Sequence, residues 1–144
     1  MRIGVDTTFL VQVSIRKHPG HGSARAEMAK RLTAGDLFVM APQVVAEFIH
    51  IVTDPRRFEQ PLSMAEALQQ AQAWWNARET EQVVPTPESV AQFWRWMVEF
   101  RLGRKRLLDT MLAATYVSHS VHTILSSNAR DYGTFGCLNV IVPE

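Results

Sequence analysis

The chain alternates between short apolar, β-rich runs and longer stretches in which apolar residues recur at helical spacing. The short runs predict strands at residues 2–5, 37–40, 82–84, 122–126 and 139–142. The longer stretches predict helices at residues 9–15, 24–33, 42–54, 63–75, 86–103 and 107–118. Strands that alternate with helices predict an α/β fold, in which helices cover both faces of a parallel sheet.

Composition narrows the class of protein. With 144 residues, 47% hydrophobic and 20% charged, the chain fits one packed domain over residues 1–144 and is too apolar for a disordered protein. Its net charge of +1 gives no general attraction to nucleic acid or to an anionic membrane. The sequence has no apolar run of about 18 residues that would span a bilayer, and the single Cys137 fits a reducing compartment. We therefore expect a cytoplasmic protein that does not contact membranes.

Short side chains with oxygen donors follow several of the predicted strands. Asp6 comes after the first strand, Glu47 lies early in the helix after the second, and Asn128 and Asp131 follow the penultimate strand. Ligands of open parallel sheets bind outside the carboxyl ends of the strands, so chemistry is expected at these positions. Asp109 joins them as a candidate because it opens the helix at 107–118 and faces apolar neighbours.

Glu47 and Asp109 lie on helix faces that are otherwise apolar. Glu47 shares its face with Val44 and Ile51, and Asp109 shares its face with Leu112. A carboxylate on a core-facing stripe is costly unless it is paired or binds a metal, although each acid taken singly also fits a solvated surface or a helix end. Three converging carboxylates would need a cation, and oxygen ligands favour Mg²⁺ or Mn²⁺. Such a site suits hydrolysis of a phosphodiester.

Four segments of the chain form a recognisable series, VDTTFL at 5–10, VVAEFIHI at 44–51, LLDTMLAATY at 107–116 and ILSSNARDYGTF at 124–135. In this order they resemble the PIN domain, and most closely the VapC-type toxins of prokaryotic toxin–antitoxin pairs. The resemblance covers nearly the whole chain. It implies a three-layer α/β/α sandwich with a central, mainly parallel sheet of four or five strands.

The same resemblance implies an activity and its partners. VapC-type proteins are typically Mg²⁺-dependent endoribonucleases that form homodimers and are held inactive by a cognate antitoxin. By this resemblance Asp6, Glu47 and Asp109 would hold Mg²⁺, or Mn²⁺ in its place, and a bound water would attack an RNA phosphate.

Three further positions match the family pattern, and a fourth departs from it. Asn128 falls on the fourth acidic-site position, and Asp131 matches the acid that commonly follows it, so both would orient water or a second metal ion. Thr8 corresponds to a frequent hydroxyl near the first Asp and would face the substrate. Ser126 stands where the family usually has Thr.

Basic residues gather in two places that would suit contact with RNA phosphates. Arg104 and Lys105 belong to a cluster just before Asp109, and Lys17 and His18 belong to another after the first predicted helix. Solvated loops explain both clusters equally well.

The four tryptophans divide by helical position. Trp75 and Trp94 continue apolar stripes and are predicted to be in the core, whereas Trp74 and Trp96 are predicted to be partly buried. The last two would then be available to stack on bases or to lie in a protein interface.

Two other functions compete with a nuclease. One is a non-catalytic PIN-like module that binds RNA or protein, which would have no use for the acids at Asp6, Glu47 and Asp109. The other is a phosphate-accepting receiver-type domain, which needs paired acids after the first strand that this chain lacks.

Overall fold

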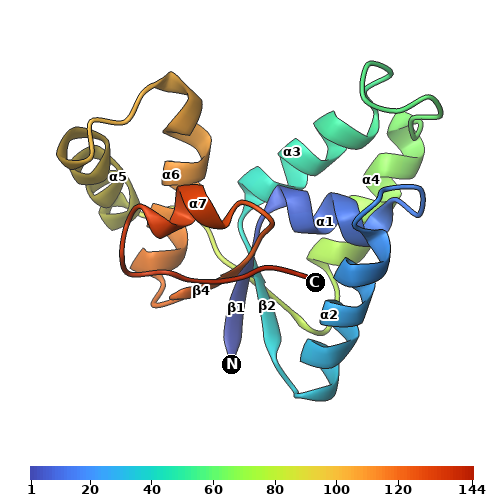
Figure 1. The fold of residues 1–144 in the computed structure, drawn as a ribbon, viewed down its shortest axis with the longest axis horizontal. Helices are drawn as coiled ribbons and strands as arrows, with labels where there is room; N and C mark the ends of the chain where they lie inside the picture. The colour runs from blue at the N-terminus through green and yellow to red at the C-terminus, as the bar shows by residue number, and fades with distance from the viewer.

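Five strands form the centre of the computed structural model, which describes all of residues 1–144 (Figure 1). They lie in the order β3-β2-β1-β4-β5, and every neighbouring pair is parallel. The strands are β1 (Arg2–Val5), β2 (Leu37–Met40), β3 (Thr80–Gln82), β4 (Thr123–Leu125) and β5 (Asn139–Ile141). The α/β fold predicted from the alternation of elements is confirmed, with five strands that are all parallel.

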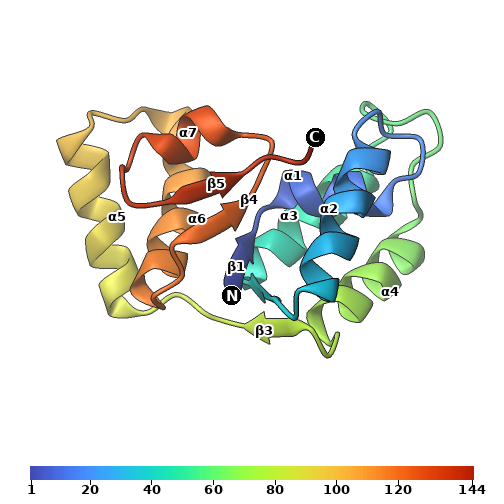
Figure 2. The same cartoon turned by 60° about the horizontal axis from the view of Figure 1, so that its bottom comes forward.

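Helices cover both faces of this sheet, which gives three layers. Helices α1 to α4 lie on one side and α5 to α7 on the other, as Figures 1 and 2 show. The helices are α1 (Thr7–Ser14), α2 (His21–Thr33), α3 (Pro42–Val52), α4 (Met64–Trp75), α5 (Pro87–Glu99), α6 (Leu107–Ser118) and α7 (Ala129–Gly133), with a 3-10 turn η1 (Arg104–Arg106) before α6. None of them has both the length and the apolar character needed to cross a membrane.

The direction in which the chain crosses the sheet reverses between β1 and β4. From β1 it proceeds through β2 to β3, whereas β4 and β5 continue on the other side of β1. Because such crossovers are right-handed, the reversal places the two groups of helices on opposite faces. It also opens a crevice at the carboxyl ends of β1 and β4, which is where sheets of this kind bind ligands.

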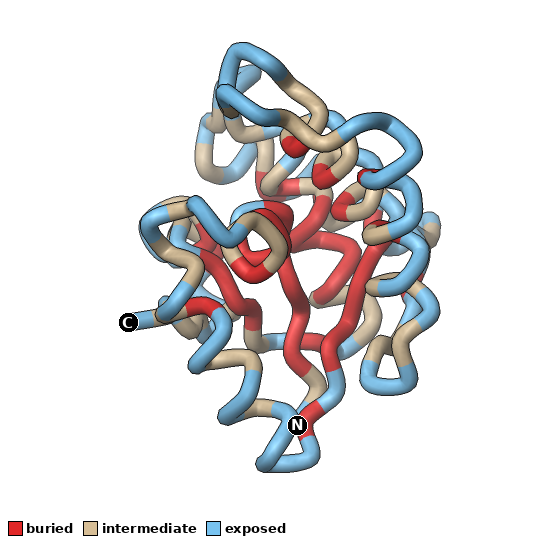
Figure 3. Tube along the Cα trace, turned by 90° about the vertical axis from the view of Figure 1, so that its right-hand side faces the viewer, coloured by how far each residue is buried: buried red, intermediate tan, exposed pale blue.

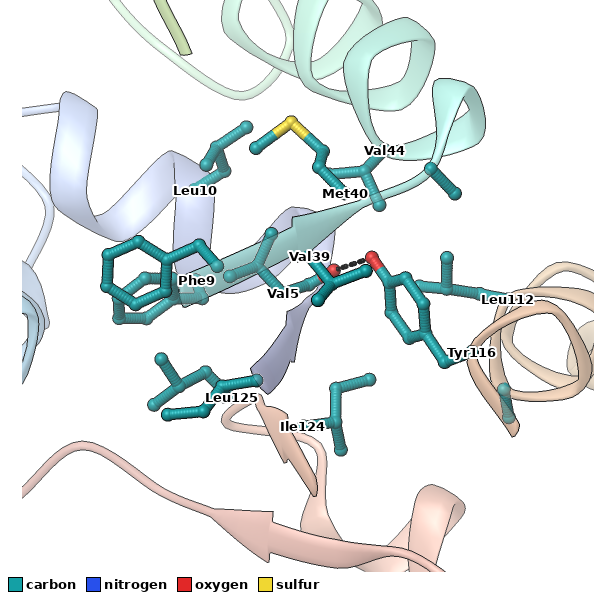
Figure 4. Packing of buried hydrophobic residues seen from close by; sticks show 14 of the residues in the cluster. Val5, Phe9, Leu10, Val39, Met40, Val44, Leu112, Tyr116, Ile124 and Leu125 are labelled. Atoms are coloured by element: carbon teal, nitrogen blue, oxygen red, sulfur yellow. Dashed lines mark hydrogen bonds between the residues drawn. The ribbon is translucent and has the colours of Figure 1, made fainter. Parts of the chain in front are cut away.

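The central strands carry the core. The buried stretches of the chain converge on them, while the connecting loops are exposed (Figure 3). Ile3 and Val5 of β1 and Phe38 to Met40 of β2 are all buried. These runs are apolar without alternation because helices cover both faces of the strands. Figure 4 shows side chains from both helical layers packed against them.

Tyr116 of α6 crosses β1 at Gly4. Its hydroxyl donates a hydrogen bond to the carbonyl oxygen of Val5 (Figure 4). Its ring lies so close to the strand that a Cβ on Gly4 would be 2.6 Å from Cδ2 of the tyrosine. Glycine is therefore required here by the close approach of an aromatic ring, which anchors α6 on the strand that leads to Asp6.

The sequence misplaced one of the smaller elements and missed another. The third strand is Thr80–Gln82 and not residues 82–84. It is an edge strand made of polar residues, and Glu81 accepts two hydrogen bonds from the Arg2 guanidinium, at 3.0 Å from Nε and 2.6 Å from Nη2. Helix α7 was not predicted, because its five residues are too few to show a period.

The assignment of two tryptophans on α5 is also reversed. Trp94, predicted to be in the core, is 62% exposed, and Trp96, predicted to be partly buried, is only 6% exposed. The buried face of α5 passes through Ser89, Phe93 and Trp96. Ser89 is buried because its hydroxyl accepts a hydrogen bond from the backbone N–H of Thr86, the N-cap of α5, at 3.0 Å and lies 2.6 Å from the hydroxyl of Ser118. Because Ser89 is polar, the buried face of α5 is not recognisable in the sequence as an apolar stripe.

Candidate active site

Asp6 lies at the carboxyl end of β1 and caps α1. One of its oxygens, Oδ1, accepts hydrogen bonds from the backbone N–H of Phe9 at 3.0 Å and from the hydroxyl of Thr8 at 2.8 Å. The other, Oδ2, accepts a hydrogen bond from Ser126, which follows β4. The side chain is only 3% exposed. Hydrogen bonds from α1 and from the segment after β4 therefore fix the side chain of Asp6.

The charge of Asp6 is not compensated by these contacts. Burial raises its pKa from 3.8 to about 6, and the negative charge of Asp109 adds to the rise, although the hydrogen bonds from Ser126, Phe9 and Thr8 oppose it. No Lys or Arg forms an ion pair with Asp6. A buried carboxylate without a cation is an electrostatic cost that the fold tolerates.

Asp109 lies in the first turn of α6, across the crevice from Asp6. Its Oδ2 accepts a hydrogen bond from the amide nitrogen of Asn128 at 3.2 Å, and its Oδ1 lies 3.5 Å from the hydroxyl of Tyr132. Burial raises the pKa of Asp109, and the charges of Asp131 and Glu47 raise it further, whereas Arg106 lowers it. The acids are thus near enough to repel one another.

Glu47 projects from the second turn of α3 and is held by a neutral side chain. The amide of Gln43, one turn earlier, donates to Oε1 of Glu47 at 2.7 Å and to the carbonyl oxygen of Leu108 at 2.8 Å. Gln43 therefore links α3 to the start of α6. Glu47 is half-buried and has no ion-pair partner.

Asn128 and Asp131 occupy the short helix α7 in different ways. The backbone N–H of Asn128, at the N-cap, donates to the hydroxyl of Ser126 at 2.8 Å. Asp131 lies 3.7 Å from the guanidinium of Arg106, which also donates to the carbonyl oxygen of Asp131 and lies over the ring of Phe135. Asn128 therefore links Asp109 to Ser126, which in turn binds Asp6. The charge of Asp131 is neutralised in part by Arg106.

Of the remaining predicted site residues, one lies at the mouth of the site and two lie outside it. Thr8 is exposed and hydrogen-bonded to Asp6, so the structure places it at the mouth of the site. Arg104 and Lys105 lie on η1 with exposed side chains that form no hydrogen bond or ion pair with the acids. They precede Asp109 in sequence and do not contact it.

The donor set suits a hard divalent cation, although the acids do not form a ready-made chelate. No group of three or more His, Cys, Asp or Glu side chains is arranged to hold a metal ion. The donors that do gather are carboxylate, amide and hydroxyl oxygens, and burial, with a smaller effect of neighbouring acids, raises the pKa of Asp6 and of Asp109. Oxygen donors of this kind fit Mg²⁺ or Mn²⁺ and not zinc.

Comparison with known families agrees with this arrangement. The family model for the PIN domain matches residues 3–132. The chain belongs to the PIN domain family. Within it, this PIN domain is 26% identical over 141 residues to a protein named Ribonuclease VapC24 from Mycobacterium tuberculosis, covering 98% of this chain and 96% of the relative. It is 27% identical over 139 residues to Ribonuclease VapC31 of the same species, covering 96% of each.

Solved structures share the fold at lower identity. VapBC2 from Rickettsia felis, bound to a promoter DNA fragment, aligns over 100% of both chains with a TM-score of 0.72 and 13% identity. VapC20 from Mycobacterium tuberculosis, described as a toxin that cleaves the sarcin-ricin loop, aligns over 96% of this chain and 98% of its own with a TM-score of 0.67 and 19% identity. These structures support the three-layer architecture of this PIN domain.

Sequence reasoning missed two neutral residues of this PIN domain's site. Tyr132 is buried beside the acids, and burial together with the charges of Asp6 and Asp109 raises its pKa well above the ordinary value, so its hydroxyl stays a donor. Gln43 holds Glu47. The i, i+4 spacing of Gln43 and Glu47 is the one signal that could have found the second contact.

Proposed function

We propose that this PIN domain is a Mg²⁺-dependent endoribonuclease and the toxin of a toxin–antitoxin pair. The observation that carries the proposal is the buried carboxylate of Asp6, which faces Asp109 across the crevice between β1 and β4 without a compensating cation. A scaffold would have no reason to maintain such a costly pair, whereas a site that binds a cation gains from it.

Asp6, Glu47 and Asp109 would hold the Mg²⁺ ion, and Mn²⁺ would also fit these oxygen donors. When bound, Mg²⁺ supplies a Lewis acid that withdraws charge from a phosphate and lowers the pKa of water. Glu47 is half-buried and held by Gln43 alone, so its side chain can turn toward Asp6 as the ion binds. Asn128 and Asp131 would orient water beside them, and Thr8 would contact the substrate at the mouth.

RNA is the proposed substrate because the curated relatives are named ribonucleases. The donor chemistry fits a phosphodiester, and the exposed Arg104 and Lys105 on η1 have no partner within the chain that would compete for a phosphate. With RNA as substrate, the cytoplasm is the proposed site of action.

An antitoxin and a second copy of the chain are the proposed partners. One of the solved structures that share this fold is a toxin–antitoxin complex from Klebsiella pneumoniae. This chain carries apolar side chains that a protein partner would cover, including Trp94 and Val98 on α5, of which Val98 is 78% exposed. Light scattering on the purified protein would give the oligomeric state directly.

The decisive experiment is cleavage of total RNA and of tRNA by the purified protein in Mg²⁺, in Mn²⁺ and in chelator. We expect cleavage with either ion and none in chelator. Asp109→Asn should reduce the rate at least about a hundredfold, since a ligand of the ion is lost. Glu88→Gln, a change at an exposed acid in the first turn of α5, is the matched control and should cleave normally. Full activity of Asp109→Asn, or cleavage in chelator, would refute the proposal.

A further inference from the structure

A cavity opens beside Asp6, where Thr8, whose hydroxyl binds Asp6, forms part of its lining. Its volume is about 530 Å³, within the range of small-ligand sites. It lies between α1, the connection that follows α1, and the connection that follows α3, two loops that come together at the same end of the molecule in Figures 1 and 2. None of the acids of the candidate site lines this cavity, and neither Arg104 nor Lys105 does.

A row of hydrogen bonds connects this cavity to Asp6. The Thr8 hydroxyl donates to Asp6 at 2.8 Å, the Ser127 hydroxyl donates to Thr8 at 3.3 Å, and the Gln12 amide donates to Ser127 at 3.3 Å. Thr8, Gln12 and Ser127 all line the cavity. An RNA strand that passes over Asp6 would therefore meet polar side chains that continue into the cavity.

The walls of the cavity are cationic. Lys17 and Arg57 contribute charged side chains to the lining, and no carboxylate does. The ammonium group of Lys17 donates only to the neutral amide of Gln60, at 3.1 Å, so its charge is not compensated. Arg57 is 60% exposed and lies 3.7 Å from Asp54, a long contact at the surface that is worth little. This surface would attract a polyanion that the acids alone would repel.

Two further residues suit a nucleotide in particular. Phe58, on the loop after α3, places an aromatic side chain in the lining, on which a base can stack. Nδ1 of His18 accepts a hydrogen bond from the backbone N–H of Gly20 at 2.9 Å, which leaves Nε2 as the N–H donor of the neutral ring. Cations, a ring and amide or hydroxyl groups are the combination that binds single-stranded RNA.

We propose that this cavity holds the nucleotide adjacent to the one cleaved, with Lys17 and Arg57 on its backbone phosphates and the Phe58 ring stacked on its base. The proposal rests on the nuclease function proposed above and adds the direction in which the RNA strand leaves the acids. Specificity for the neighbouring base would then reside in Gln12, His18 and Phe58.

The test measures binding and not cleavage. A fluorescent single-stranded oligoribonucleotide of mixed sequence is titrated in EDTA, over a range of salt concentrations, with the wild type and with Lys17→Ala/Arg57→Ala. Each phosphate contact on a single strand contributes about 0.7 to the slope of log affinity against log salt, so the slope should fall by about 1.4. The control Lys30→Ala/Arg78→Ala removes two exposed cations near the opposite end of the sheet and should leave the slope unchanged.

The stacking part is tested with substitutions that keep the fold. Phe58 is partly buried against the core, so Phe58→Leu preserves apolar packing while it removes the ring. We expect Phe58→Leu to weaken RNA binding roughly tenfold and Phe58→Tyr to restore it. In cleavage assays with Mg²⁺, all cavity variants should raise KM more than they lower kcat.

Each outcome decides a separate point. Equal salt slopes for the cavity and control double variants would overturn the cavity proposal even if the wild type cleaves RNA. The same holds if the cavity variant binds RNA normally and loses affinity for a polyglutamate peptide, because the cavity would then take an acidic protein segment. A wild type that fails to cleave in Mg²⁺, with RNA binding that depends on Lys17 and Arg57, would refute the nuclease and support the cavity.

Discussion

Asp6 and Glu47 follow neighbouring strands of the same sheet, yet the protein holds them in opposite ways. Asp6 is buried at the end of β1 and accepts hydrogen bonds from Phe9, Thr8 and Ser126. Glu47 is half-buried one helical turn beyond Gln43, which is its only hydrogen-bond partner. The first acid is fixed by three hydrogen bonds from two segments of the chain, and the second is held by a single neutral side chain.

This difference teaches how a site without a ready-made chelate can still be organised. The fixed carboxylate sets the position of the site and carries the electrostatic cost, as its raised pKa records. The adjustable carboxylate, Glu47, would supply a ligand without a comparable cost because water still reaches it. Perturbing the fixed side should therefore change both the fold and the activity, and perturbing the adjustable side should change the activity alone.

The largest expected effect is a pair of opposite changes in Asp6→Asn. Activity on RNA should fall at least about a hundredfold, because a ligand of the proposed ion is lost. In chelator at neutral pH, the free energy of unfolding should rise by about 1–3 kcal/mol, because the buried charge is removed. Cleavage assays and urea unfolding measure the two effects. A fall in both activity and stability would show that Asp6 is not electrostatically costly.

The same contrast predicts a pH dependence on the fixed side. The pKa of Asp6 in the fold, about 6, lies above the ordinary 3.8, so the folded chain binds this proton more tightly than the unfolded chain. Its contribution to stability is present below about pH 4 and is lost as the pH rises through about 6. In chelator, the stability gap between Asp6→Asn and the wild type should widen over this window and then stay constant. A gap that does not vary with pH would contradict the raised pKa.

Gly4→Ala tests the support beneath Asp6. The new Cβ would lie 2.6 Å from the ring of Tyr116, so the ring must move off β1. We expect a loss of about 1–3 kcal/mol in the free energy of unfolding, measured with urea. Gly22→Ala is the control, because its Cβ would meet nothing within 4 Å. If both variants are equally stable, Tyr116 does not anchor α6 as tightly as its contacts indicate.

The smallest effects are expected on the adjustable side. Glu47→Gln should weaken the apparent affinity for Mg²⁺ in the cleavage assay roughly tenfold, and Gln43→Ala, which frees Glu47, should weaken it less. Both should leave the free energy of unfolding within about 0.5 kcal/mol of the wild type. A large loss of stability in Gln43→Ala would instead assign Gln43 to holding α3 against α6 through its contact with Leu108.

The sheet and the ends of its strands were predictable because both faces are covered. A strand buried on two sides has to be apolar throughout, as in Phe38 to Met40, and a short oxygen donor after it then stands out. The sequence therefore placed Asp6, Glu47 and Asp109 at one end of the sheet. The neutral groups that orient them, Gln43 and Tyr132, have no comparable signal.

The predictions that were wrong concern segments in which polar residues are buried or form a strand. Ser89 is buried on α5 through hydrogen bonds, so the apolar stripe alone selected Trp94 in place of Trp96. The edge strand β3 is polar because it pairs on one side only, which displaced its predicted position. The cavity beside Asp6 could not be predicted at all, since Arg57 and Phe58 are brought to Lys17 by tertiary packing alone.

The hydrogen bond between Ser126 and Asp6 joins residues 120 positions apart in the chain. During synthesis β1 is made long before its partner β4 and the serine that holds Asp6. Contacts of such wide sequence separation form late, after the loop between them has closed. A growing chain therefore has no assembled centre until the segment that contains Ser126 has been made, and any hydrolytic capacity arises only after that point.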